Sequence, residues 1–313
     1  MVLDFEPRLR ETASDIEVEG YELREATIPG VARLIGGVND RYGPESDNPL
    51  SYHNGEHGMD IIDRGVKLAN ILYPYMKPHH QRGIFDVIFW SGGGHDSVQG
   101  LSGDQASEIA SSHLVSTEAK STGDRYLGSK LFERRTNDAV LSTAVLWTPK
   151  GELVQPNVLR GSHDPAKLIM SNADINGIAM EGSSRMFVDV VNLCYEMNGG
   201  QADVDEVYEF LLSQAGFLKE RLNDERVKTD IAYYFPETVE EIYGEMRGIF
   251  RPNILLAYAT AKLLSDRSRF ETPAKLAMKG LGLVDRRLLG AALGSTLHGV
   301  IMPDITPTNP DAS

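Results

Sequence analysis

Histidine and carboxylate side chains recur in three short segments of this 313-residue chain. The segments are Tyr52-His53-Asn54-Gly55-Glu56-His57-Gly58-Met59-Asp60, Gly94-His95-Asp96 and Ala173-Asp174-Ile175. Imidazole and carboxylate groups are good ligands for borderline-to-hard divalent metals, whereas the single cysteine, Cys194, leaves no thiolate cluster for a structural zinc site. The sequence therefore indicates a divalent metal site, provided that folding brings the three segments together.

A helix is expected to position the first segment. Residues 56–73 have apolar side chains at intervals of three and four, which is typical of an amphipathic helix. These are Met59, Ile62, Val66, Ala69 and Leu72. His57 and Asp60, three residues apart, can share one face of that helix. Asp174 is predicted on another helix, among apolar neighbours, where a buried carboxylate needs a metal ion or other cation beside it.

Other local signals predict where further helices begin and end. Asp164-Pro165 is typical of an N-cap followed by the first helical residue. Asp203, with Glu206 three residues later, has the spacing of a capping box. Pro252 is expected to interrupt the helical run over residues 238–266, because proline cannot donate the hydrogen bond that continues a helix.

Strand-like patterns are scarce, and only residues 152–158 are predicted to include a short extended piece. We therefore predict an all-α fold, a multi-helix bundle. One domain is expected over residues 1–302, followed by a loose tail, 303–313, that holds three prolines.

Composition restricts the class of partner. The chain has 31 Lys and Arg against 45 Asp and Glu, a formal net charge of −14, which argues against a protein that grips a nucleic-acid polymer. No run approaches the roughly 18 apolar residues of a membrane span, so no membrane partner is expected. The first ten residues lack the apolar core of a secretory signal, and one cysteine cannot form an internal disulfide, so we expect a cytoplasmic protein. The oligomeric state stays open.

The order of the three segments resembles that of the HD superfamily of metal-dependent phosphohydrolases. More narrowly, Tyr52-His53-Asn54, His57 and Asp60-Ile61 are similar to the Y-H-N-x-x-H-x-x-D-[VI] signature of class I cyclic-nucleotide phosphodiesterases. The resemblance covers a core of about residues 50–220 and implies an HD-domain, phosphodiesterase-like helical bundle.

The resemblance also implies roles for the site residues. Four would hold a tightly bound metal ion: His57, His95, Asp96 and Asp174. Asp96 would also bridge to a second ion, His53 would be the general acid, and Asp60 would orient an imidazole. Tyr52 and Asn54 would line the pocket near the phosphate.

A further likeness lies in Ser213-Gln214-Ala215-Gly216-Phe217, which resembles the phosphodiesterase segment with a purine-binding glutamine and a stacking phenylalanine. The alternative is a packing face with a satisfied glutamine. The chain departs from the phosphodiesterase pattern after Asp96, where a further histidine is usual, and at the triplet Gly92–Gly94, which either loosens its helix or allows close backbone approach. Glu108 follows at a distance similar to that of an acidic site residue in smaller bacterial HD hydrolases.

These observations predict a hydrolase for a phosphoester of a small nucleotide. One or two divalent ions would lower the pKa of a bound water and supply hydroxide at neutral pH, and His53 would protonate the departing oxygen. The sequence does not distinguish Mg, Mn, Fe, Co and Zn. A 3′,5′-cyclic nucleotide is the first expected substrate. The alternatives are a nucleotide or deoxynucleotide mono- or triphosphohydrolase, and a non-catalytic, metal-stabilised nucleotide-sensing module.

Overall fold

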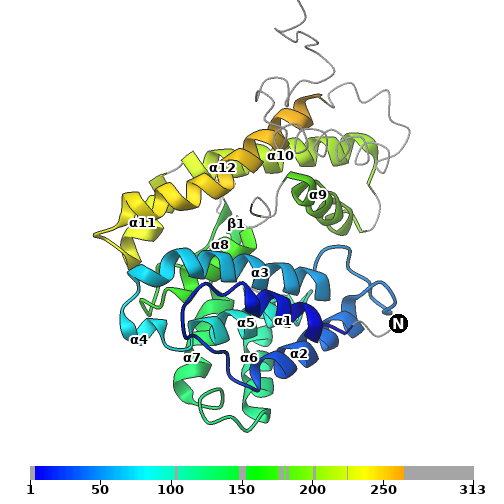
Figure 1. The fold of residues 1–313 in the computed structure, drawn as a ribbon. Coiled ribbons are helices and arrows are strands. Elements are labelled where there is room, and N and C mark those ends of the chain that lie inside the picture. The colour runs from blue at the N-terminus through cyan, green and yellow to red at the C-terminus, as the bar shows by residue number, and fades with distance from the viewer. Residues whose placement is uncertain are drawn as a thin grey trace, which may run out of the picture. The chain divides into compact units, whose positions relative to one another are not determined.

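The computed structural model describes residues 4–102, 105–147, 153–175, 180, 183–199, 202–223 and 225–263. Helices make up nearly all of the regular secondary structure of these residues, as Figure 1 shows, which confirms the all-α prediction. The elements are α1 (Glu6–Ser14), α2 (Thr27–Tyr42), α3 (Gly55–Leu72), the 3-10 turn η1 (Tyr73–Tyr75), α4 (Pro78–Gln81), α5 (Ile84–Gly94), α6 (Ala106–Ser121), α7 (Lys130–Leu141), β1 (Leu146–Trp147), β2 (Leu153–Val154), α8 (Ala166–Ile175), α9 (Ser183–Met197), α10 (Val204–Asn223), α11 (Glu225–Tyr234) and α12 (Val239–Leu263).

The chain divides into two compact units. Unit 1 comprises Met1–Gly177 and Glu225–Met246, and unit 2 comprises Ile178–Asp224 and the chain from Arg247 onwards. The single domain over residues 1–302 stays a prediction, and the expected tail, 303–313, lies outside the described residues. Among the helices that are described, none is both long and apolar enough to cross a bilayer.

Helix α5 is the centre of unit 1. All of its residues, Ile84 to Gly94, are buried, and it packs against α2, α3, α6, α7 and α8. A continuous apolar helix of this kind must be covered on every side, so its neighbours are held close to one another. Because the site segment Gly94-His95-Asp96 lies at its C-terminal end, α5 fixes that segment within the core.

The triplet Gly92–Gly94 allows close approach, the second of the two predicted alternatives. A Cβ atom at Gly92 would lie 2.9 Å from Ile62 Cγ1 on α3, and one at Gly93 would lie 2.8 Å from Val31 Cγ1 on α2. At Gly94 it would overlap Val115 of α6. Three neighbouring helices therefore contact the backbone of α5 immediately before the site.

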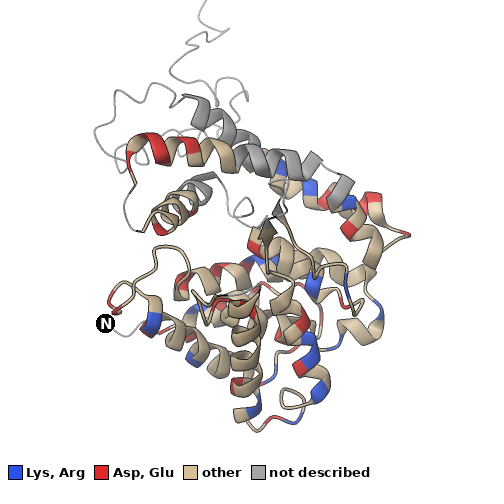
Figure 2. Ribbon diagram, turned by 180° about the vertical axis from the view of Figure 1, so that it is seen from behind, with Lys and Arg blue, Asp and Glu red and all other residues tan. Residues whose placement is uncertain are grey.

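The predicted helix starts are confirmed by hydrogen bonds. Asp164 Oδ1 accepts from the backbone N–H of Ala166, the first residue of α8, at 3.1 Å. Asp203 Oδ1 accepts from the backbone N–H of Glu206, while Glu206 Oε2 accepts from that of Asp203, at 2.9 and 2.8 Å. This reciprocal capping box starts α10, whose acidic first turn is coloured red in Figure 2.

The predicted interruption at Pro252 is wrong, because α12 continues through it. A proline removes one hydrogen bond, and a helix of 25 residues retains most of the others on both sides. The expected extended piece over 152–158 is confirmed only for Leu153–Val154, which pairs antiparallel with Leu146–Trp147.

Candidate metal centre

The three sequence segments meet in unit 1. His53 lies in the turn before α3, and His57 is in the first turn of that helix. His95 and Asp96 directly follow α5, and Asp174 lies in the last turn of α8. Because α3 packs against both α5 and α8, and α5 packs against α8, the ends of these helices come together. The predicted convergence of the segments is therefore present.

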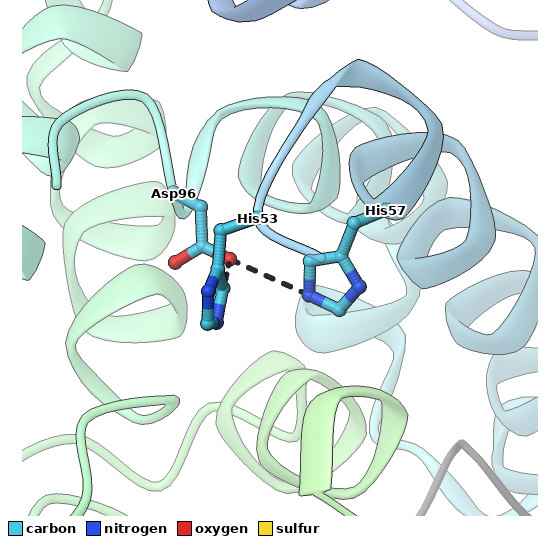
Figure 3. A group of neighbouring side chains, drawn as sticks. All are labelled: His53, His57 and Asp96. Atoms are coloured by element: carbon cyan, nitrogen blue, oxygen red, sulfur yellow. Dashed lines mark ion pairs between the residues drawn. The ribbon is translucent and has the colours of Figure 1, made fainter. Parts of the chain in front are cut away.

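One group of potential ligands comprises His53, His57 and Asp96, which Figure 3 shows with their polar atoms turned toward one another. The Oδ2 atom of Asp96 lies 4.0 Å from His53 Nε2 and 3.4 Å from His57 Nε2. Separations of this size between ligand atoms leave room for an ion bound at about 2.0–2.2 Å from each.

The second group comprises His57, His95 and Asp174. The Oδ1 atom of Asp174 lies 3.7 Å from His57 Nε2 and 3.9 Å from His95 Nε2. His95 Nε2 is also 2.9 Å from Asp96 Oδ2, so the two groups are adjacent and share His57. Within each group all the ligand atoms lie within 4.8 Å of one another, in the part of the chain that the structure describes.

Burial makes this arrangement costly unless a cation is present. The side chains of His57 and His95 are 2% exposed, and each Nε2 atom lies within 4 Å of both the Asp96 and the Asp174 carboxylate. The Nδ1 atom of His95 lies 2.9 Å from the carbonyl oxygen of Gly92, so Nδ1–H donates there and the Nε2 lone pair faces the carboxylates. Two nitrogen lone pairs that face two carboxylates in the core require a proton or a metal ion between them. The residues present therefore fit a divalent metal.

The carboxylates favour the protonated form of the histidines, and the histidines favour the ionised form of the carboxylates. Burial alone would lower the pKa of His95, but the Asp96 and Asp174 carboxylates raise it to about 9. Burial would raise the pKa of Asp96, yet His95 and His53 hold it well below its usual range. The pKa of Glu108, in the first turn of α6, is raised by burial and by the charges of Asp96 and Asp174. Glu108 therefore lies within electrostatic range of the centre.

Tyr52 and Asn54 both contact the histidine segment. The buried Tyr52 ring lies 4.2 Å from the ring of His57 and 4.9 Å, edge to face, from that of His53. Asn54 is the N-cap of α3, since its Oδ1 accepts from the backbone N–H groups of Glu56 and His57 at 3.0 and 3.4 Å. Its Nδ2 donates to the Leu50 carbonyl at 3.1 Å. Asn54 thus fixes the start of the helix that carries His57, and its predicted place near a phosphate stays a prediction.

Asp60 is buried on α3, and its carboxylate binds Arg8 of α1 at 2.8 Å. The same guanidinium also contacts Glu56 at 2.6 Å and Asp63 at 3.3 Å. The predicted role of Asp60 in orienting an imidazole stays a prediction. Arg8 itself has no local sequence signal that marks it as the partner of Asp60. Three acids spaced four and three residues apart on one helix face indicate that a cation is needed there, but they do not identify one 52 positions away.

Gln214 and Phe217 both lie on α10, in unit 2. Gln214 is partly buried, and the side chain of Phe217 lies outside the described ones. Their predicted contact with a base stays a prediction.

Comparison with known proteins gives no matching family model, no matching curated protein and no matching solved structure.

Proposed function

We propose that this chain is a metal-dependent phosphohydrolase of the HD type that cleaves a phosphoester of a small nucleotide, a 3′,5′-cyclic nucleotide first of all. One observation carries the proposal: the buried Nε2 atoms of His57 and His95 lie 2.9–3.9 Å from the carboxylates of Asp96 and Asp174. The choice of a nucleotide rests on the likeness of residues 52–61 to the phosphodiesterase signature.

The ligand set supports one or two divalent ions. His57, His95, Asp96 and Asp174 would hold the first, and His53 and Asp96, from the neighbouring group, would contribute to a second position. A divalent ion bound there would lower the pKa of a water molecule and offset the charge of a phosphate. Glu108 adds a carboxyl group within electrostatic range of these residues.

His53 is the group best placed to act on a substrate. Its side chain is 27% exposed, whereas those of His57 and His95 are 2% exposed, so an incoming phosphoester can reach it. Its ring makes a T-shaped contact with the buried ring of Tyr52. An imidazole titrates near neutrality and can protonate the departing ester oxygen, which supports its role as the general acid.

The test combines metal analysis with an activity panel. The purified protein is analysed for metal, loaded separately with Mg, Mn, Fe, Co or Zn, and incubated with cyclic and linear nucleotides. We expect one or two equivalents of metal and turnover of a cyclic nucleotide. If only linear mono- or triphosphates are turned over, the substrate is a linear nucleotide and the cyclic assignment is wrong. The absence of phosphoester turnover with every metal would overturn the enzyme proposal.

The variant His53→Ala separates an enzyme from a nucleotide sensor. In an enzyme we expect turnover to fall by roughly 10²–10⁴-fold, the usual contribution of general acid catalysis, while the content of the first metal is retained. His113→Ala is the control, since His113 is an exposed histidine on α6. A metal-loaded protein that binds nucleotide without turnover, before and after the substitution, would instead be a sensing module.

A further inference from the structure

A cavity of about 600 Å³ lies in unit 1, lined by none of the candidate metal ligands. Its walls come from three segments: residues 74–80 around η1 and α4, residues 163–165 before α8, and residues 233–238 between α11 and α12. In Figure 1, α4 and the turn after α11 lie on the same side of the molecule. The lining residues are Pro74, Tyr75, Lys77, His80, His163, Pro165, Tyr233, Tyr234, Phe235, Pro236, Glu237 and Thr238. The volume suits a small molecule.

The walls are held in place by contacts outside the cavity. The hydroxyl of Tyr234 donates to the carbonyl of Val158, and Phe235 is buried. The guanidinium of Arg135 binds Asp164 at 2.5 Å and donates to the carbonyl oxygen of His80 at 2.9 Å, which connects two of the three segments. Proline and aromatic side chains have few torsions to fix, so a ligand would meet a largely preformed cavity.

Stacked rings form one part of this wall. His163 lies flat against Tyr233, with ring centroids 4.2 Å apart and 11° between the planes. Both residues line the cavity, and His163 is exposed while Tyr233 is partly exposed. Tyr234 meets Tyr233 edge to face at 5.0 Å. Such a surface favours a planar aromatic ligand, because an added ring extends the stack.

Charges of both signs lie near His80. Lys77 is the cation of the lining, and burial, His79, Arg135 and Lys77 together lower the pKa of His80 against the opposing charge of Asp164. Carboxylates also lie in or beside the lining: Glu237 belongs to it, and Glu245 accepts from the hydroxyl of the lining residue Tyr75 at 3.2 Å. Within the lining, an anionic group would therefore be favoured beside Lys77, and the His80 imidazole offers a further hydrogen-bonding group.

We propose that this cavity is a second ligand site, which binds a small planar aromatic molecule with one anionic group, its ring on the His163–Tyr233 stack and its anion at Lys77. An aromatic carboxylate and a nucleoside monophosphate share this chemistry. The proposal does not depend on the metal centre or on hydrolysis.

The test uses the full chain with a chelator present, so that the metal centre takes no part. Indole-3-carboxylate is titrated by isothermal calorimetry, with uncharged indole and cationic tryptamine as matched probes. We expect one site for the carboxylate and at least severalfold weaker binding of both other probes. Adenosine monophosphate, compared with adenosine, is the second arm. Whichever anion binds more tightly identifies the source of the ligand.

Variants locate the site. Tyr233→Leu and His163→Ala should each weaken indole-3-carboxylate binding by roughly three- to tenfold, the size of a lost aromatic contact. Lys77→Ala should weaken indole-3-carboxylate binding severalfold and make the affinity less dependent on salt concentration. The matched controls are Lys67→Ala on α3 and His113→Ala on α6, both exposed and outside the cavity, and they should bind as the parent does.

Since His163 and Lys77 are exposed, their variants keep the test open even if Tyr233→Leu fails to fold. Three results would overturn the proposal: no binding of either anion at millimolar concentration, equal affinity in the His163 and Lys77 variants, or tighter binding of tryptamine than of the carboxylate.

Discussion

At the scale of the residue, a single carbonyl group decides which nitrogen of His95 faces the candidate metal centre. The Gly92 carbonyl oxygen accepts a hydrogen bond from Nδ1–H at 2.9 Å, so the Nε2 atom faces Asp96 and Asp174. His57 is the other buried imidazole and belongs to both ligand groups. The two histidines therefore differ in what they would contribute: the orientation of His95 is fixed by the backbone, whereas His57 can join either group, although its one Nε2 lone pair binds only one ion at a time.

Because His57 is shared, its removal should affect metal binding most. For His57→Ala we expect bound metal to be lost on dialysis, with a decrease in affinity greater than the roughly 10–100-fold that loss of an outer-shell partner costs. His53→Ala should reduce only a second equivalent. Plasma emission spectrometry of the dialysed proteins measures this. Full metal retention in His57→Ala would contradict the assignment of the ligand set.

His80 predicts a pH dependence of stability that is independent of the metal centre. Its pKa is lowered in the folded protein, first by burial and then by His79, Arg135 and Lys77, against Asp164. The folded state thus binds fewer protons than the unfolded state, so this contribution is present above about pH 6.5 and is lost as pH falls through the folded pKa. His80→Gln should flatten the pH dependence of the free energy of urea unfolding between pH 5 and 7, whereas the exposed His113→Gln on α6 should leave that dependence as it is in the parent protein.

At the scale of the element, α5 owes its position to the lack of side chains at its C-terminal end. Gly94→Ala would place a methyl group against Val115 and Leu34. We expect unfolding free energy to fall by about 1–3 kcal/mol, as in other overpacked cores. Gly36→Ala on α2 is the matched control, because no atom lies within 4 Å of the new Cβ, and it should be neutral or stabilising by roughly 0.5–1 kcal/mol. Equal effects in urea unfolding would contradict the role given to the triplet.

At the scale of the whole molecule, the Arg135–Asp164 pair connects α7 to the start of α8 and to the segment after α4. Both side chains are buried, and Arg135 also donates to the carbonyl oxygens of Arg82 and His80. This pair lies behind the cavity proposed as a second ligand site. Breaking this pair therefore tests how much the contact between these segments contributes to the stability of unit 1.

Asp164→Asn keeps an acceptor for the backbone of α8 but leaves the Arg135 charge buried without its carboxylate. We expect a loss of about 3–5 kcal/mol in unfolding free energy. The control is Glu133→Gln, which breaks the exposed pair with Lys120 and should cost less than about 1 kcal/mol. Denaturant unfolding of both variants measures the difference, and similar losses would show that the buried pair is not decisive.

The sequence by itself determined the features that depend on neighbours within one or two helical turns. The apolar spacing over 56–73 predicted α3, and Asp164, Asp203 and Glu206 predicted the starts of α8 and α10, because these signals act over four residues or fewer. The histidine and aspartate types also predicted the metal-binding chemistry of the three segments.

Only the tertiary structure decided which distant groups meet. Arg8 binds Asp60, and the side chains of Ile62 and Val31 pack against the backbone of the glycine triplet. Three separate segments line one cavity. Pro252 remained inside α12 although its local preference opposes a helix. Such contacts follow from how side chains of different elements pack, and one chain's local pattern carries no information about those pairings.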